Sequence, residues 1–180
     1  IVFKFGTSED ITTNFAPVCA DLVYMTPTTA EALEILSDNA DDTVEGSGAR
    51  VVTVEGIGDD FGLLSEDVTM NGTTAVALSN QFRRVFRIVV KESGTYANQT
   101  TGSHAGTITV RGAGAGSTWG TINLKNGFPL GASLIGAYTV PAGYTAHIIH
   151  EEVFVDSNKD VDLIFFRREN INDVITPYSP

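Results

Sequence analysis

The chain has 180 residues, which is long enough to bury one substantial hydrophobic core. Hydrophobic residues make up 42% of it and charged residues 18%, a composition that is typical of a folded domain and excludes a disordered chain. The formal net charge of −11 argues against a surface built to bind nucleic acid, because phosphate binding needs clustered Lys and Arg.

Residues 1–47 differ from the rest and are predicted to form an N-terminal arm with the first strands or a short helix. The chain opens on Ile1 without a signal-peptide pattern, so we expect Ile1 to begin a processed segment. Thr28–Asn39, TTAEALEILSDN, is the best helix candidate, since Thr29 can cap a helix with one apolar face. The same letters fit an edge strand equally well, because Leu33 and Ile35 alternate with their neighbours.

From Arg50 onward the pattern is that of short strands separated by turns. In Arg50–Ile57 the residues that can face a core alternate with residues of a more mixed face, and a turn bracketed by glycines follows this segment. Asn71-Gly72 is a strong hairpin signal, because a type I′ turn needs positive φ at both central residues. The later predicted strands are Leu64–Met70, Thr73–Leu78, Gln81–Lys91, Thr107–Arg111, Trp119–Lys125, Gly136–Val140, Tyr144–Val155 and Val161–Arg168.

About eight or nine short strands with at most one short helix predict an all-β protein. We expect a single β-sandwich or jelly-roll-like domain whose core covers residues 48–168. Extended N- and C-terminal arms flank this core, and the C-terminal arm is residues 169–180, which end in Pro-Tyr-Ser-Pro.

Oxygen-bearing side chains at calcium-loop spacing occur at Asp156, Asn158 and Asp160, which are weak metal candidates. Val161 stands where the loop needs a glycine, so we interpret this stretch as a solvated hairpin tip and predict no metal site. A second acidic group has the composition to bind a hard cation weakly and consists of Asp38, Asp41, Asp42 and Glu45.

Three further patterns resemble catalytic or cofactor motifs and fail on geometry. His147 and His150 point to opposite faces of a strand and cannot share a zinc ion. Gly112–Gly116 precedes a strand, whereas a phosphate loop precedes a helix. Cys19 is the only cysteine and is interpreted as a buried apolar residue. No catalytic residue and no cofactor is therefore predicted.

A basic cluster and two aromatic residues are candidates for binding surfaces. Arg83, Arg84, Phe86 and Arg87 lie in an apolar strand pattern, which favours an ion-pairing strand face or a subunit interface. The rings of Trp119 and Tyr96 are candidates for stacking on a glycan, although such residues more often fill a core or an interface.

Four segments together resemble a family of small virion-associated β-sandwich proteins of tailed bacteriophages, common among marine phages. They are GARVVTVEGIGDDFGLLSEDVTMNGTTAV (Gly48–Val76), QFRRVFRIVV (Gln81–Val90), AGTITVR (Ala105–Arg111) and AYTVPAGYTAHI (Ala137–Ile148). Members of the family share such a hairpin, an arginine-rich strand, an "AG.I" strand and a "YTVPAG.TA" turn in this order. The resemblance covers roughly residues 46–168 and implies a virion protein without enzymatic activity.

We therefore expect a structural protein that decorates the capsid or associates with the head on the outer surface of a phage particle. Its expected partners are the major capsid protein or other virion proteins and further copies of itself, with no nucleic acid and no membrane. Arms such as Ile1–Phe15 and Glu169–Pro180 would lie across neighbouring subunits. The alternatives are a tail fibre or receptor-binding component that contacts glycans, and a polysaccharide hydrolase with two facing carboxylates.

Overall fold

The structure is a computed structural model that describes residues 1–8, 12–20, 22–94, 103–125, 128–155, 160–165 and 167–168. The chain divides into two units, Ile1–Gly143 and Tyr144–Pro180. All assigned strands lie in the first unit, and the described residues contain no helix. The all-β prediction is confirmed.

Nine strands are assigned within the described residues. They are β1 (Glu31–Ser37), β2 (Ala49–Ile57), β3 (Leu63–Thr69), β4 (Val76–Phe82), β5 (Arg84–Ser93), β6 (Ile108–Gly112), β7 (Thr118–Ile122), β8 (Leu124–Lys125) and β9 (Phe128–Pro129).

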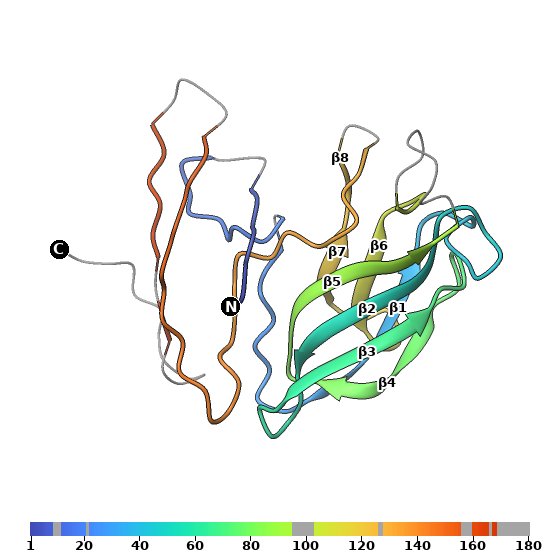
Figure 1. Ribbon diagram of the computed structural model, residues 1–180, viewed down its shortest axis with the longest axis horizontal. Coiled ribbons are helices and arrows are strands. Elements are labelled where there is room, and N and C mark those ends of the chain that lie inside the picture. The colour runs from blue at the N-terminus through green and yellow to red at the C-terminus, as the bar shows by residue number, and fades with distance from the viewer. Residues whose placement is uncertain are drawn as a thin grey trace. The chain divides into compact units, whose positions relative to one another are not determined.

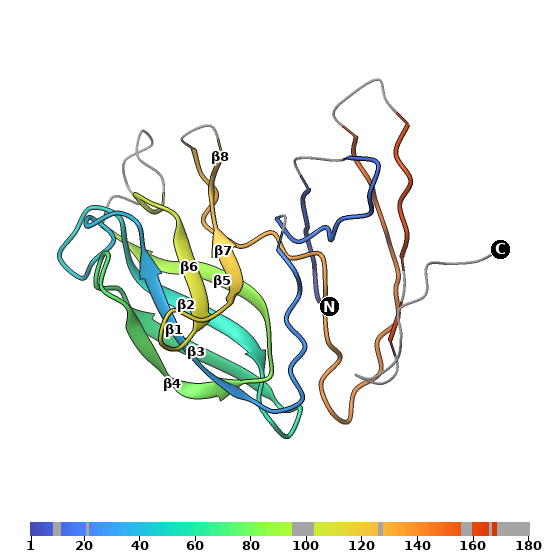
Figure 2. The same ribbon diagram turned by 180° about the vertical axis from the view of Figure 1, so that it is seen from behind.

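Two antiparallel sheets pack as a β-sandwich. One sheet has the strand order β4-β1-β6-β7 and the other has the order β3-β2-β5, while β8 and β9 form a separate two-stranded ribbon. The three-stranded sheet faces the viewer in Figure 1, and the four-stranded sheet faces the viewer in Figure 2. The predicted sandwich is therefore present in the first unit.

The segment predicted as a short helix or an edge strand is β1. Leu33 and Ile35 are buried and alternate with partly exposed Glu34 and Leu36. The helix alternative is wrong because backbone partners on two sides outweigh the weak helical tendency of so short a segment. The edge placement is also wrong, since β1 lies between β4 and β6 inside its sheet.

Asn71-Gly72 connects the two sheets and does not close a hairpin. Gly72 has a φ of +58°, whereas Asn71 is not among the residues with positive φ, so the turn is not type I′. The strand before it, β3, pairs with β2, and the strand after it, β4, pairs with β1. Similarly, the predicted long strand Gln81–Lys91 is divided at Arg83, where the chain leaves β4 and enters β5 in the other sheet.

The predicted strands Gly136–Val140, Tyr144–Val155 and Val161–Arg168 are not found among the described residues. Residues 144–155 and 160–165 are instead two extended lengths that run side by side in opposite directions (Figures 1 and 2). A strand needs a hydrogen-bonded neighbour, and every residue of 144–155 is exposed. This segment has the apolar pattern expected of a strand, but within the described residues it is not paired into a sheet.

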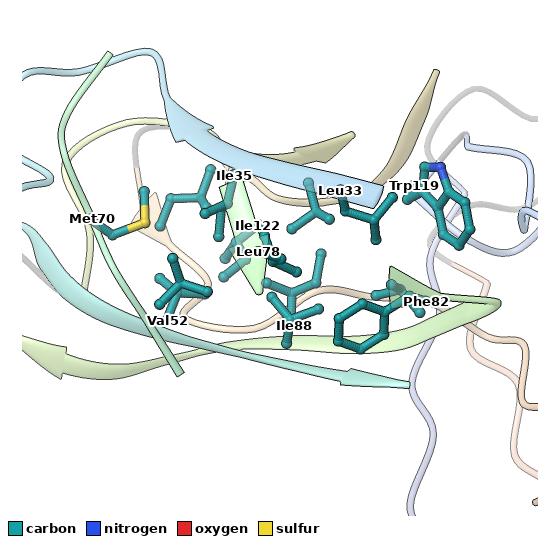
Figure 3. Packing of buried hydrophobic residues seen from close by; sticks show 14 of the residues in the cluster. Leu33, Ile35, Val52, Met70, Leu78, Phe82, Ile88, Trp119 and Ile122 are labelled. Carbon is teal, nitrogen blue, oxygen red and sulfur yellow. The ribbon is translucent and has the colours of Figure 1, made fainter. Parts of the chain in front are cut away.

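The hydrophobic core lies between the two sheets. Leu33, Ile35 and Ile122 from one sheet meet Val52 and Ile88 from the other (Figure 3). Burial of each such side chain contributes about 1.5–3 kcal/mol to stability. The core also includes Val54, Val68, Met70, Leu78, Phe82, Val85, Ile108, Val110 and Trp119.

Trp119 reaches this core through an irregularity in β7. The register between β6 and β7 shifts between Val110 and Arg111, which pair with Gly120 and Thr118 respectively. Trp119 is the extra residue at this bulge, and both Trp119 and Gly120 are buried as a result.

Substitution of Gly56 tests the close contact between β2 and β5. A Cβ at Gly56 would lie 1.9 Å from the Arg84 carbonyl oxygen and 2.9 Å from the Phe82 ring. Because backbone cannot yield there, Gly56→Ala is expected to lower the free energy of unfolding by about 3 kcal/mol in urea titrations. At Gly58 a Cβ meets nothing closer than 3.4 Å. Gly58→Ala should therefore change stability by less than about 1 kcal/mol, and equal effects at the two positions would contradict the structure.

Candidate functional site

Arg83 and Arg87 form ion pairs within the chain. The Arg83 Nη1 lies 3.3 Å from the Asp59 Oδ1, and its guanidinium carbon lies 4.3 Å from the centre of the Phe61 ring. The Arg87 Nη1 lies 3.3 Å from the Glu55 Oε2, and these residues face each other across β2 and β5. The prediction of an ion-pairing strand face is confirmed for Arg87, whereas Arg83 lies between β4 and β5 and pairs with Asp59 in the connection between β2 and β3.

The same sheet face carries a second ion pair, between Lys91 on β5 and Asp67 on β3. The Thr53 hydroxyl on β2 also donates to Asp67, at 2.6 Å. The hydrogen bonds from Lys91 and Thr53 lower the pKa of Asp67. This face is therefore a set of paired charges and not a cluster of unmatched positive charge.

Arg84 and Phe86, the other two residues of the predicted interface, are buried in the first unit. The Arg84 Nη1 donates to the carbonyl oxygens of Pro27 at 3.0 Å and Arg83 at 2.5 Å. The Phe86 ring packs against the Tyr138 ring, with their centres 4.9 Å apart. Both side chains therefore make their contacts within the fold. Of the two arginines that form ion pairs, Arg87 has the more exposed side chain, at 49% against 15% for Arg83.

Asp42 in the acidic loop is fully buried and accepts four hydrogen bonds. Its Oδ1 accepts from the backbone N–H groups of Ala49 at 2.7 Å and Ala105 at 2.8 Å. Its Oδ2 accepts from the Ser37 hydroxyl at 2.6 Å and the Gly106 N–H at 2.9 Å. The carboxylate therefore joins the end of β1, the start of β2 and the approach to β6. The sequence carries no signal that distinguishes Asp42 from its neighbour Asp41.

The metal candidates receive no support in the described part of the chain. Asp38, like Asp42, accepts a backbone hydrogen bond, from the Thr107 N–H at 2.8 Å. Among the residues that are described, no group of three His, Cys, Asp or Glu side chains is arranged to hold a metal ion. Asp156 and Asn158 lie outside the described residues, and Asp160 is exposed.

The glycine-rich turn Gly112–Gly116 does hold an anion, and that anion is the Glu34 carboxylate. The backbone N–H groups of Gly114 and Ala115, both with positive φ, donate to Glu34 at 3.1 Å. Successive N–H groups in such a turn form a small anion-binding concavity. The Arg111 Nε completes the site at 2.7 Å from Glu34. A phosphate would have to displace this internal carboxylate.

The three histidines play different parts. His147 and His150 are exposed, and the His150 Nε2 lies 3.8 Å from the Glu152 Oε2. His104 is buried: its Nδ1 donates to the Gly106 carbonyl oxygen at 2.6 Å, and its Nε2 accepts from the Gly131 N–H at 3.4 Å. Sequence reasoning did not single out His104, which braces the same loop as Asp42.

Trp119 is buried in the core with 2% of its surface exposed. It therefore presents no ring face to a sugar, and its interpretation as a glycan contact is corrected to that of a core residue. Tyr96, the other glycan candidate, lies outside the described residues. Cys19 is buried as predicted, and this burial raises the pKa of its thiol.

A cavity of about 140 Å³ lies in the first unit on the side of β6 and β7. Thr107, Thr121 and Asn123 provide its polar lining, and Leu124, Leu130 and Leu134 provide much of its apolar lining. No charged side chain of the described residues lines it, so its lining does not provide the two facing carboxylates that a polysaccharide hydrolase uses.

Comparisons with protein-family models, with curated proteins and with solved structures find no match. Among the residues described, no helix is long and apolar enough to span a membrane.

Replacement of Asp42 by Asn tests the buried carboxylate. The amide would place an N–H₂ group against backbone N–H donors, so Asp42→Asn should lower the free energy of unfolding by about 3 kcal/mol in urea titrations. Asp41→Asn is the matched control, because Asp41 is exposed, and it should change stability by less than about 0.5 kcal/mol. Similar values for the two variants would contradict the assigned hydrogen bonds.

The Glu34 site should make stability depend on pH. The hydrogen bond from Arg111 is the main reason that the pKa of Glu34 lies below its usual value of 4.5, and the hydrogen bonds from the Gly114 and Ala115 N–H groups lower it further. The folded state therefore binds fewer protons than the unfolded state, so this stabilisation is complete above that value and disappears as the pH falls through the folded pKa. We expect the stability difference between wild type and Glu34→Gln to shrink under acid conditions.

Arg111→Gln provides the control for this dependence. In that background the main cause of the lowered pKa is absent, so the effect of Glu34→Gln should vary less with pH. Chemical denaturation measures the difference in the free energy of unfolding between wild type and Glu34→Gln. A difference that stays constant between about pH 7 and about pH 3 would contradict the assigned hydrogen bonds of Glu34.

Proposed function

We propose that the chain is a non-enzymatic structural protein of a tailed-phage virion, a capsid-decorating or head-associated accessory that assembles through symmetric subunit contacts. The observation that carries this proposal is the orientation of the N-terminal segment. Ile1, Phe3 and Phe5 are exposed, with Phe3 at 74% and Phe5 at 71%, while Lys4 between them points inward.

Lys4 is tied to β5, so the orientation of this segment is fixed. Its ammonium donates to the Phe86 carbonyl oxygen and lies 5.6 Å from the centre of the Phe86 ring. Burial lowers the pKa of Lys4 to about 8, because the charged form loses solvation. A charged residue inside and phenylalanines outside reverse the usual arrangement for a surface segment.

This reversal fits a segment whose outer face is covered in an assembly. Burying Phe3 and Phe5 against a neighbour would contribute about 1.5–3 kcal/mol for each side chain. Repeated over symmetric copies on a particle, such modest contacts become strong through avidity. The N-terminal arm is thus proposed to provide contact area without a second hydrophobic core.

Charge supports an external position on the particle. The net charge is −11, and Arg83 and Arg87 are already paired with acidic side chains of the same chain. A surface of this kind repels packaged DNA and favours contact with protein. The major capsid protein is the proposed partner.

The glycan-binding and hydrolase alternatives have less support. Trp119 is buried, and the one cavity described above lacks carboxylates in its lining. Neither alternative gains a specific observation from the described residues.

Reconstruction of particles of the encoding phage, with quantitative mass spectrometry, tests the proposal. We expect the chain on the outer head surface in a copy number that matches the capsid lattice. A copy number that matches the tail symmetry, or a position inside the head, would overturn it.

Particle binding by purified protein tests the N-terminal segment. Phe3→Asp/Phe5→Asp should abolish binding to particles that lack the chain, because it places two charges on the apolar face. Thr73→Asp/Thr74→Asp is a control with the same added charge at exposed polar positions outside the arm, and it should bind like wild type. Equal binding by the two variants would exclude this contact.

A further inference from the structure

The hydrogen bonds of the buried His104 ring assign its protonation state. Only 1% of the surface of His104 is exposed. The Gly106 carbonyl oxygen, 2.6 Å from Nδ1, can only accept a hydrogen bond, so Nδ1 carries a proton. The Gly131 N–H, whose nitrogen lies 3.4 Å from Nε2, can only donate, so Nε2 offers its lone pair. The folded chain therefore holds the neutral ring with its proton on Nδ1.

Residues 131–133, the edge segment, cover the outer edge of β5. The Gly131 carbonyl oxygen accepts from the Val90 N–H at 2.9 Å. The Ser133 N–H donates to the Ile88 carbonyl oxygen at 2.8 Å, and the Ile88 N–H donates to the Ser133 hydroxyl at 2.9 Å. An isolated antiparallel bridge lies between these contacts. The edge segment therefore occupies backbone groups that β5, the outer strand of its sheet, would otherwise expose.

Protonation of His104 at Nε2 would remove one of the contacts that hold the edge segment. The new Nε2–H would face the Gly131 N–H, so two donors would meet without an acceptor between them. The positive charge would also form in a ring that is almost closed to water. Both effects favour the neutral ring in the folded state. The folded state then binds fewer protons than the unfolded state, so this stabilisation is present at neutral pH and is lost as the pH falls.

The charged groups around the ring do not provide it with a paired counter-ion. Asp38 and Asp42, on the connection between β1 and β2, accept backbone N–H groups of the loop that carries His104. No carboxylate of the described residues forms an ion pair with the ring. On β5 the nearest charged residues in sequence, Lys91 and Glu92, are exposed, and the edge segment itself has no charged residue.

We propose that His104 is a pH-sensitive latch, which holds the edge segment on β5 while the ring is neutral and releases it when Nε2 is protonated under mildly acid conditions. Histidine suits this role because its charge changes within the physiological pH range. Release would expose the backbone groups of Ile88 and Val90, and such groups on an outer strand can pair with another chain. This latch goes beyond the proposed function and does not depend on it.

Hydrogen exchange of the full chain, followed by NMR at about pH 7.5 and about pH 5, tests the latch. His147→Gln/His150→Gln, at two exposed positions, provides a background in which His104 is the only histidine. Protection factors are compared, because they correct for the effect of pH on the chemical exchange rate.

The edge segment should lose protection at the lower pH while the sandwich keeps it. The Gly131, Val90 and Ser133 amides should become about tenfold less protected, which is the effect of leaving one buried donor without an acceptor. The amides of Val54 and Val110, in the inner strands β2 and β6, should keep their protection.

His104→Asn separates the latch from general effects of acid. The Asn Nδ2 can take the place of the ring Nδ1 and donate to the Gly106 carbonyl oxygen, but the shorter side chain does not reach Gly131 and does not titrate. In this variant the edge segment should be less protected already at neutral pH, to the same degree as in the single-histidine chain at acid pH. Its protection should then not change with pH.

The ¹⁵N resonances of the His104 ring give a second result that needs no substitution at this position. Nε2 should gain a proton over the same pH range in which the edge segment loses protection. A ring that stays neutral at about pH 5, equal protection of the edge segment at both pH values, or an equal acid-induced loss in His104→Asn would each overturn the proposal. A parallel loss at Val54 and Val110 would also overturn it, because the whole sandwich would then be unfolding.

Discussion

The buried carboxylate of Asp42 is the constraint on which the sandwich depends. Its hydrogen bonds reach Ser37 at the end of β1, Ala49 at the start of β2, and the Ala105 and Gly106 amides before β6. Since β2 belongs to one sheet and β1 and β6 to the other, one side chain fixes where three strands begin or end. A buried charge is tolerated only when it is fully hydrogen-bonded, and here every donor but one is backbone.

Two other carboxylates similarly accept hydrogen bonds from backbone N–H groups of the first unit. Glu66 on β3 accepts the N–H groups of Ser79 at 2.6 Å and Asn80 at 2.9 Å, which occupies donors on the outer strand β4. Glu34 accepts those of the glycine-rich turn. Exposed donors on an edge strand invite pairing with other chains, so Glu66 also protects that edge. Part of the acidic composition therefore serves the fold.

Local patterns predicted most of the strands before residue 125, but they failed after that residue and did not predict which strands pair. The alternation in Arg50–Ile57 and Thr107–Arg111 identified β2 and β6, because half-buried strands impose period two on the sequence. Asn71-Gly72 predicted a hairpin that does not exist, since a turn signal does not say to which sheet the next strand belongs. The ion pairs of Arg83 and Arg87 followed from charge in a strand pattern, but the burial of Trp119 depends on a bulge. Tyr144–Val155 has the apolar pattern of a core strand but is not assigned as a strand and is exposed along its whole length, which periodicity alone does not reveal.

The crossing of the chain between sheets has a consequence for the time course of folding. The connections β1–β2, β3–β4, β4–β5 and β5–β6 each change sheet, so neither sheet can form from a continuous stretch of sequence. Folds in which most strand pairs are distant in sequence form slowly, because the chain loses the entropy of closing long loops before the stabilising contacts are made. Synthesis proceeds from the N-terminus, so residues 31–122, which contain every strand of the two sheets, leave the ribosome before the exposed apolar residues of 144–155. All strands of the sandwich are thus available for pairing before that exposed apolar segment has been made.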